Sequence, residues 1–263
     1  MEQTFQKQVP VGGGSWVTVE VHGDPGAPGL VVLPGVMSDA RAWRRVASAV
    51  RAWPSVAVVN RRGRTPSGPL TDTYSLRTEV EDLYAVLDAF DGTRAVFGWS
   101  YGGLIALLAA DGRPVRQLIA YEPVMRPFGL HALPDLASAD ERRDRDATVD
   151  IVNRRITGLD PARVAALRAD REVWENLRRL SEPLYRETLA LNEPAPDVMA
   201  RRADRVDLIV GGASRGTAPY GTSFDDVRRR VPAARVHELA DEGHLVHLEA
   251  PLQLAEMLNG LAD

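Results

Sequence analysis

The stretch AVFGWSYGG, residues 95–103, decides the fold of this chain. Its first residues are apolar, as in a short buried strand, and the helix-forming run Leu104–Ala110 follows directly. Between them stands Ser100, bracketed by Gly98 and Gly102 in a G-x-S-x-G pattern. In so sharp a turn, side chains at the two glycine positions would collide with the strand and the helix. The strand before and the helix after favour a nucleophile elbow over a plain glycine-rich turn, with the Ser100 hydroxyl presented at a helix N-terminus.

Composition and charge narrow the class of protein. The chain has 263 residues, 44% hydrophobic and 26% charged, which is typical of one large globular domain or one domain carrying an insertion. A net charge of -4 offers no basic surface for nucleic acid. With no cysteine, disulfides, thiolate nucleophiles and thiolate metal ligands are excluded. Met1–Val11 lacks a signal-peptide core and no apolar run approaches ~20 residues, so we expect a cytoplasmic protein with no nucleic-acid or membrane partner.

The order of apolar segments predicts a hairpin followed by strand–helix repeats. Alternating or continuous apolar runs indicate strands at Phe5–Val9, Trp16–His22, Leu30–Leu33, Val56–Val59 and Val115–Tyr121. Amphipathic spacing indicates helices at Asp39–Trp53 and Tyr74–Phe90. The alternation predicts a mostly parallel sheet with right-handed crossovers and helices on its faces.

This alternation breaks after residue 124. Charged helical stretches follow at Asp140–Thr157, Pro161–Asp170, Glu172–Leu180 and Pro183–Leu191. The sheet resumes at Val206–Val210 and Arg235–Leu239, with helices at Ser223–Arg230 and Leu252–Leu261. We therefore predict a core domain of residues 1–124 and 203–263 and a helical insertion of residues 125–202. A lid over the site is favoured over a bundle beside the sheet.

The serine elbow, together with features near both ends of the chain, resembles the α/β-hydrolase superfamily over nearly the whole length. The resemblance implies an α/β class: a mostly parallel eight-stranded sheet flanked by helices, with an inserted helical cap. Many members carry His-Gly where this chain has Pro34-Gly35. The oxyanion hole implied at these positions consists of the backbone N–H groups of Val36 and Tyr101. A plain strand-ending turn is the alternative reading of Pro34-Gly35.

The loop after Val56–Val59 also resembles the family. Members often carry Asp-x-Arg-Gly-x-Gly there, and Arg62-Gly63 stand in the middle of that pattern. The resemblance implies a structural role in which the arginine ties neighbouring loops together, with no part in catalysis.

The chain has five histidines that are candidates for the catalytic base. His244 follows a glycine before the last helix, in a Gly-His…Leu-Glu-x-Pro pattern that resembles the family's base loop. His22 and His237 lie on strands and are expected to be structural or surface residues. His131 lies in the predicted cap, which is a poor position for a base, and His247 is expected to cap or pack a helix. His244 is therefore the expected base.

The acid departs from the usual pattern. Most relatives place an aspartate where this chain has Ser214, and a serine cannot carry the charge that stabilises an imidazolium. Some branches, including the haloalkane dehalogenases, instead place a carboxylate after the strand that follows the elbow. Here that position holds Glu122, and the order Ser100, Glu122, His244 keeps the nucleophile–acid–base sequence of the fold.

Other assignments of the acid remain open. Glu122 precedes a proline and is also compatible with a helix-capping or salt-bridged carboxylate. The alternative acids are Asp225 or Asp226 in the next predicted helix, and Asp241 near the base itself. A serine–histidine dyad without an acid is a further alternative.

These residues predict a serine hydrolase that needs no metal or organic cofactor and acts on a small-molecule carboxylic ester, lactone or thioester. The elbow serine stands where epoxide hydrolases and dehalogenases need aspartate, which argues against both reactions. The expected substrate-binding residues surround the predicted site: Gly35, Met37, Trp99, Met125 and Phe128. A ligand-binding protein, or non-hydrolytic acyl transfer or cyclisation in natural-product metabolism, is the alternative. A homodimer is compatible with the sequence.

Overall fold

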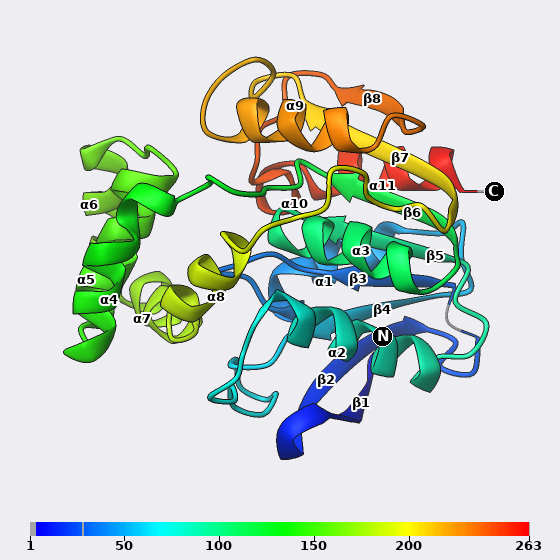
Figure 1. Ribbon diagram of the computed structural model, residues 1–263, viewed down its shortest axis with the longest axis horizontal. Coiled ribbons are helices and arrows are strands. Elements are labelled where there is room, and N and C mark those ends of the chain that lie inside the picture. Colours follow the sequence, from blue (N-terminus) through cyan, green and yellow to red (C-terminus); the bar gives the residue numbers. More distant parts are fainter. Residues whose placement is uncertain (1–3, 28, 263) are drawn as a thin grey trace.

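One mixed sheet runs through the whole molecule, with helices on both of its faces (Figure 1). This computed structural model describes residues 4–27 and 29–262. Met1–Gln3, Pro28 and Asp263, which the predicted core domain includes, lie outside the described residues. The strands are β1 Thr4–Val11, β2 Ser15–Gly23, β3 Leu30–Leu33, β4 Ser55–Asn60, β5 Ala95–Trp99, β6 Val115–Tyr121, β7 Ala203–Gly211 and β8 Arg235–Leu239.

The strand order is β1-β2-β4-β3-β5-β6-β7-β8. β1 pairs with β2 and β2 with β4 in antiparallel fashion, whereas every later pair is parallel. The predicted opening hairpin and mostly parallel sheet are confirmed. Since parallel strands end at the same edge, the segments that follow β3, β5, β6 and β7 meet there.

Helices connect the strands and cover the sheet. They are α1 Ala40–Ala49, α2 Leu76–Ala89, α3 Tyr101–Gly112, α4 Leu133–Glu141, α5 Arg145–Ile151, α6 Pro161–Ala169, α7 Arg171–Leu180, α8 Leu184–Leu191, α9 Tyr220–Arg230, α10 Val246–Glu249 and α11 Pro251–Leu261, with the short turns η1 Gly12–Gly14, η2 Leu130–Ala132 and η3 Val152–Ile156. Within the described ranges, no helix has the length and apolarity that crossing a membrane would require.

The predicted first helix, Asp39–Trp53, extends four residues too far at its C-terminal end. It ends at Ala49 because Val50 takes an extended conformation, with φ -71° and ψ 130°. Val50 and Trp53 bury their side chains against the sheet, and Pro54 then leads the chain into β4.

Two apolar cores lie on the two faces of the sheet. One packs α2, α3 and α9 against one side, and the other packs α1 and α11 against the opposite side. β3 shows how one strand serves both, because Val31 and Leu33 belong to the first core while Leu30 and Val32 belong to the second. This double burial explains why the strands read as continuous apolar runs.

The segment between β6 and β7 forms a separate group of helices, η2 to α8 (residues 130–191), called the inserted helices below. The chain crosses to this group after β6 and returns from α8 to β7 (Figure 1). The predicted helix Asp140–Thr157 is wrong in its extent, because Arg143 at φ 54° ends α4 and Asp144 caps α5. α4 was missed, although Pro134 in its first turn is a helix-start signal. We keep the division into a core domain and a cap at residues 125–202 as a proposal.

Candidate active site

Ser100 stands in the turn between β5 and α3, in a backbone conformation that few residues other than glycine adopt. Its φ is 57° and its ψ is -121°. A methyl group on Gly98 would lie 2.5 Å from the carbonyl oxygen of Gly102, and one on Gly102 would overlap that of Leu33. Ser100 is buried, and its hydroxyl has no hydrogen-bond partner in the described part of the chain. The hydroxyl is therefore available to a substrate.

Glu122 and His244 meet at the carboxyl end of β6. Glu122 Oε2 lies 2.7 Å from His244 Nδ1, and Glu122 Oε1 accepts a hydrogen bond of 2.9 Å from the backbone N–H of Gly211. Glu122 is fully buried and has a φ of 39°, a strained value for a glutamate. A carboxylate on Nδ1 places the imidazole proton there and leaves Nε2 as the base.

The alternative acids lie elsewhere. Asp225 faces a groove beside α9, Asp226 pairs with an arginine one turn further along that helix, and Asp241 is exposed. Among the residues that the structure describes, Glu122 is the carboxylate bonded to His244.

Ser214 takes up the position of the family's usual aspartate without contacting His244. Its N–H donates to the carbonyl of Gly211 at 3.0 Å, and its own carbonyl accepts from Thr217 Oγ1 at 2.8 Å. The N–H of Gly211 is already bonded to Glu122. The loop after β7 therefore supports the carboxylate of β6 through its backbone instead of supplying a carboxylate.

Burial lowers the pKa of His244, although the hydrogen bond and the charge of Glu122 oppose the shift. A base must be neutral to accept a proton, so activity should be lost only at a pH below the ordinary histidine value of about 6.5. We expect the acid limb of kcat/KM for an uncharged ester to have an apparent pKa below about 6.5. In Glu122→Gln the negative charge that raises the pKa of His244 is gone, so the acid limb of kcat/KM should move to still lower pH. A wild-type acid limb at pH 7 or above would contradict this assignment.

Two aromatic rings pack against the His244 ring. The Tyr220 ring stacks on the His244 ring with centroids 3.5 Å apart and planes inclined by 11°. The centroid of the Trp99 ring lies 4.7 Å from that of the His244 ring. The His244 carbonyl accepts from Trp99 Nε1 at 2.8 Å, and the Gly243 carbonyl accepts from the Tyr121 hydroxyl at 2.7 Å. No motif or spacing in the sequence marks Tyr220, because its contact with His244 depends on how α9 packs.

His247 packs against neighbouring rings, as predicted. Its ring stacks on Trp43 with centroids 4.6 Å apart and lies 4.3 Å from the Trp99 ring. Burial, and to a lesser extent the neighbouring His244, lowers the pKa of His247 to about 3. His247 is therefore neutral in the folded protein across the physiological range.

This burial predicts a loss of stability in acid. Between about pH 6.5 and pH 3 the unfolded chain binds a proton at His247 and the folded chain does not, so stability falls as pH falls, by about 1.4 kcal/mol per pH unit. His247→Phe keeps an aromatic ring but removes the titration. We expect this variant to lose about 2 kcal/mol less than the wild type between pH 7 and pH 5 in urea unfolding. Parallel pH dependences of the two proteins would exclude His247 as the cause.

Two backbone N–H groups beside the serine are free. Those of Val36 and Tyr101 have no hydrogen-bond acceptor within residues 4–27 and 29–262. Tyr101 begins α3, so its N–H has no partner within the helix. Gly35 brings the other loop against the nucleophile, because a methyl group on it would lie 2.8 Å from Ser100 Cβ. An oxyanion hole consists of two such donors.

The predicted substrate-binding residues divide into two groups. Trp99 and Met125 are buried in the cores, and Trp99 also braces the base. Met37 and Phe128 are half-buried and pack against the inserted helices, while Gly35 touches the elbow. Met37 and Phe128 thus lie beside the inserted helices and Gly35 beside Ser100, and the binding role of all three stays a prediction.

The remaining histidines have structural partners. His22 Nε2 lies 3.0 Å from Glu20, and His237 Nε2 lies 2.9 Å from Asp207. His131 Nε2 lies 2.8 Å from the carbonyl of Arg155 among the inserted helices. No group of three histidine, aspartate or glutamate side chains in the described residues is arranged to hold a metal ion.

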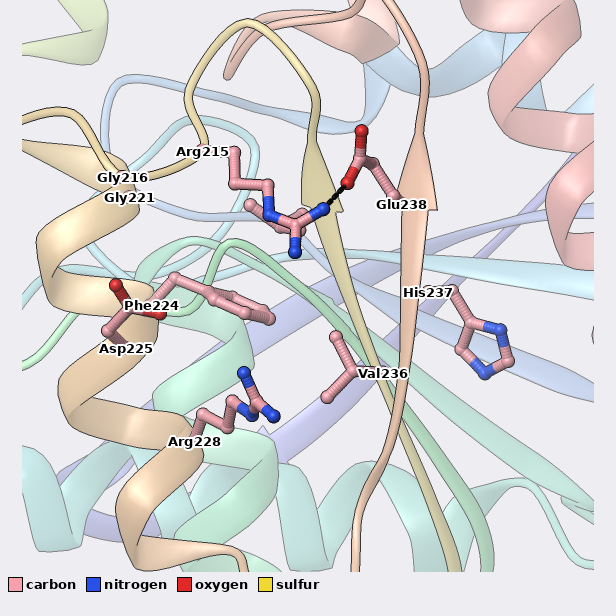
Figure 2. A pocket seen from close by; sticks show the side chains of 10 residues that line it. Arg215, Gly216, Gly221, Phe224, Asp225, Arg228, Val236, His237 and Glu238 are labelled. Carbon is pink, nitrogen blue, oxygen red and sulfur yellow. Dashed lines mark hydrogen bonds and ion pairs between the residues drawn. The ribbon is translucent and has the colours of Figure 1, made fainter.

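A groove between α9 and the sheet edge is separate from this site (Figure 2). It has a volume of about 270 Å³, with Phe224 and Val236 on its apolar walls. Figure 2 shows the ion pair of Arg215 with Glu238 at one end and Arg228 at the other. None of the elbow, base or acid residues lines it.

The chain belongs to the α/β hydrolase family, whose sequence profile matches residues 30–257, and this places it among hydrolases. An α/β hydrolase from Sphaerobacter thermophilus is 26% identical, with a TM-score of 0.79 over 97% of this chain and 99% of that chain. The enol-lactonase from Burkholderia xenovorans is 18% identical, with a TM-score of 0.76 over 96% and 98%. The bottromycin epimerase BotH is 23% identical, with a TM-score of 0.66 over 98% and 99%. No curated protein sequence matches the chain significantly.

Proposed function

We propose that this protein is a serine hydrolase that cleaves carboxylic esters, lactones or thioesters through an acyl-enzyme on Ser100. The observation that carries this proposal is the 2.7 Å contact of Glu122 with His244, whose ring lies against that of Trp99, the residue before Ser100. A serine hydroxyl is a poor nucleophile unless a positioned base takes its proton. His244, kept neutral by burial and oriented by Glu122, is such a base.

Acylation begins when Ser100 Oγ attacks the carbonyl carbon while His244 Nε2 takes its proton. The N–H groups of Val36 and Tyr101 stabilise the oxyanion. Collapse of this intermediate breaks the bond to the leaving oxygen or sulfur, which receives the proton from His244. The Glu122 carboxylate stabilises the imidazolium.

Deacylation repeats these steps with water as the nucleophile. His244 takes a proton from the water, whose oxygen attacks the acyl carbon. The bond to Ser100 Oγ then breaks, Oγ recovers a proton from His244, and the carboxylic acid leaves. In a lactone the leaving hydroxyl stays attached to the product.

A fluorophosphonate probe tests this proposal directly. The wild-type protein should become labelled on Ser100, and labelling should be lost in Ser100→Ala and after heat denaturation. A panel of nitrophenyl esters of different acyl length, lactones and acyl thioesters then identifies the preferred class by kcat/KM.

Two outcomes would change the proposal. Absence of labelling in folded protein would favour a ligand-binding role. Labelling of Ser100 without release of acid from any panel member would favour acyl transfer or cyclisation. The similarity in fold to an epimerase makes product analysis, and not labelling alone, the deciding measurement.

A further inference from the structure

Six buried charged residues form a cluster beneath the loop that carries Val36. They are the cations Arg61, Arg62 and Arg64 and the anions Glu79, Asp82 and Glu187, and each is at most 4% exposed. Charges taken out of water are costly unless they are paired, so their arrangement is constrained by geometry. Only some of them touch the candidate active site.

Arg61 is the member that reaches the loop. Its Nε donates to the carbonyl of Pro34 and its Nη2 to the carbonyl of Gly35, both at 2.9 Å. The Gly35 carbonyl and the Val36 N–H belong to one planar trans peptide and therefore point in opposite directions. By holding the carbonyl, Arg61 turns the N–H of Val36 away from itself. The same peptide segment lies against Ser100, since a methyl group on Gly35 would be 2.8 Å from Ser100 Cβ.

The second free donor belongs to a residue that Arg61 also touches. The Arg61 guanidinium lies 5.0 Å from the centre of the Tyr101 ring, and Tyr101 is fully buried. A single cation thus contacts both residues whose N–H groups lack acceptors. We propose that Arg61 is the positioning residue of the oxyanion hole, and that Glu187 links its position to the inserted helices.

Glu187 supplies the link because it comes from α8, the helix from which the chain returns to the sheet (Figure 1). Its Oε1 lies 2.6 Å from Arg61 Nη2 and its Oε2 lies 2.5 Å from Arg64 Nη2. Burial raises the pKa of Glu187, but the charges of Arg61 and Arg64 outweigh this and hold it below its usual range. Glu79, 2.6 Å from Arg61 Nη1, is the partner from the core. The guanidinium is thereby clamped between the core and the inserted helices.

Arg62 offers a matched control within the same cluster. It is the next residue in sequence and is as deeply buried as Arg61. Its partners are Asp82 of α2 and the carbonyl of Gly12, in the turn between β1 and β2. Loss of Arg62 therefore removes a buried ion pair without touching the loop that carries Val36.

The experiment compares Arg61→Met with Arg62→Met in the full chain. This inference rests on the proposed function, so both variants are first assayed with the best ester of the panel. Arg61→Met should lower kcat on the order of 10²-fold with KM within threefold, because loosened donors act mainly in the transition state. The affinity for a trifluoromethyl ketone, whose adduct with Ser100 carries an oxyanion, should fall in parallel. Arg62→Met should lose about as much stability as Arg61→Met but should change kcat less than threefold.

A second readout does not need activity. The amide chemical shift of Val36, resolved by NMR, should change in Arg61→Met, because the carbonyl of the same peptide loses its hydrogen bond, and should stay unchanged in Arg62→Met. If the wild type hydrolyses nothing, the proposed function fails while this comparison still decides the positioning role. Equal effects of the two variants on both kcat and the Val36 chemical shift would overturn the inference.

Two milder variants serve if Arg61→Met does not fold. Arg61→Lys keeps the charge but cannot reach Pro34 and Gly35 with two nitrogens, so it should lower kcat about tenfold. Glu187→Gln keeps the shape of the side chain and removes the charge that links Arg61 to α8; we expect a three- to tenfold loss in kcat. Wild-type kcat in both variants would refute the proposal.

Discussion

Replacing Ser100 by alanine is expected to lower kcat on the order of 10⁶-fold for the best substrate of the panel. The loss should be this large because, in the proposed mechanism, Ser100 Oγ is the atom that becomes acylated and no other group replaces it. Alanine removes a hydroxyl that has no hydrogen-bond partner, so the free energy of unfolding should change little. Steady-state kinetics, with urea unfolding of the same preparation, checks both statements.

A suitable control for this variant is Ser214→Ala. Ser214 is buried and lies at the usual acid position, but the structure gives its side chain no contact with His244. We expect Ser214→Ala to retain kcat within threefold. If Ser100→Ala kept more than one-hundredth of the wild-type activity, another nucleophile would have to be sought.

Replacing Glu122 by glutamine should lower kcat on the order of 10⁴-fold, as the loss of charge does for triad acids in general. The amide cannot stabilise an imidazolium, and its NH₂ group favours the tautomer with the proton on Nε2. Gln has nearly the shape of Glu, so the hydrogen bond from the Gly211 N–H can persist. The measurement is kcat together with the pH profile described above, because a structural role would not move the acid limb.

Matched controls exist for this variant among the alternative acids. Asp241→Asn is the closest, since Asp241 has a φ of 62° and asparagine tolerates the left-handed region equally well. Asp225→Asn tests the groove beside α9. Both are expected to stay within threefold of the wild type, and a loss under about threefold in Glu122→Gln would transfer the role of acid elsewhere.

The most local features were the most predictable. Gly98 and Gly102 indicate the elbow in the sequence, because a side chain at either position would collide with residues close by in sequence or in the adjacent strand. The strands Leu30–Leu33, Val115–Tyr121 and Arg235–Leu239 have the predicted bounds. The inserted helices were predicted less well, since the break at Arg143 has no glycine or proline to mark it.

The contacts that complete the site were not predictable in the same way. The interpretation of Glu122 relied on its place after a strand and on the lack of an aspartate at Ser214. No sequence pattern marked Tyr220 or Arg61, because each contacts residues far away in sequence. Tyr220 stacks on the ring of His244, and Arg61 donates hydrogen bonds to the carbonyls of Pro34 and Gly35. Arg62, predicted to tie neighbouring loops together, does join Asp82 of α2 to the carbonyl of Gly12, whereas Arg61 bonds the loop at the candidate site.

By itself the sequence determined the sheet and the elbow, because periodicity and glycine sterics act over a few residues. It also predicted Ser100 as the nucleophile and His244 as the base. The tertiary structure decided which carboxylate meets the base. β6 and β7 are neighbours, and the N–H of Glu122 bonds to the carbonyl of Ile209, which brings Glu122 to Gly211 and to His244. It also brought Arg61, which follows β4, to the carbonyls of Pro34 and Gly35 on the loop that carries Val36. Such pairings join segments up to 122 residues apart, and only the packed sheet brings them within hydrogen-bond distance.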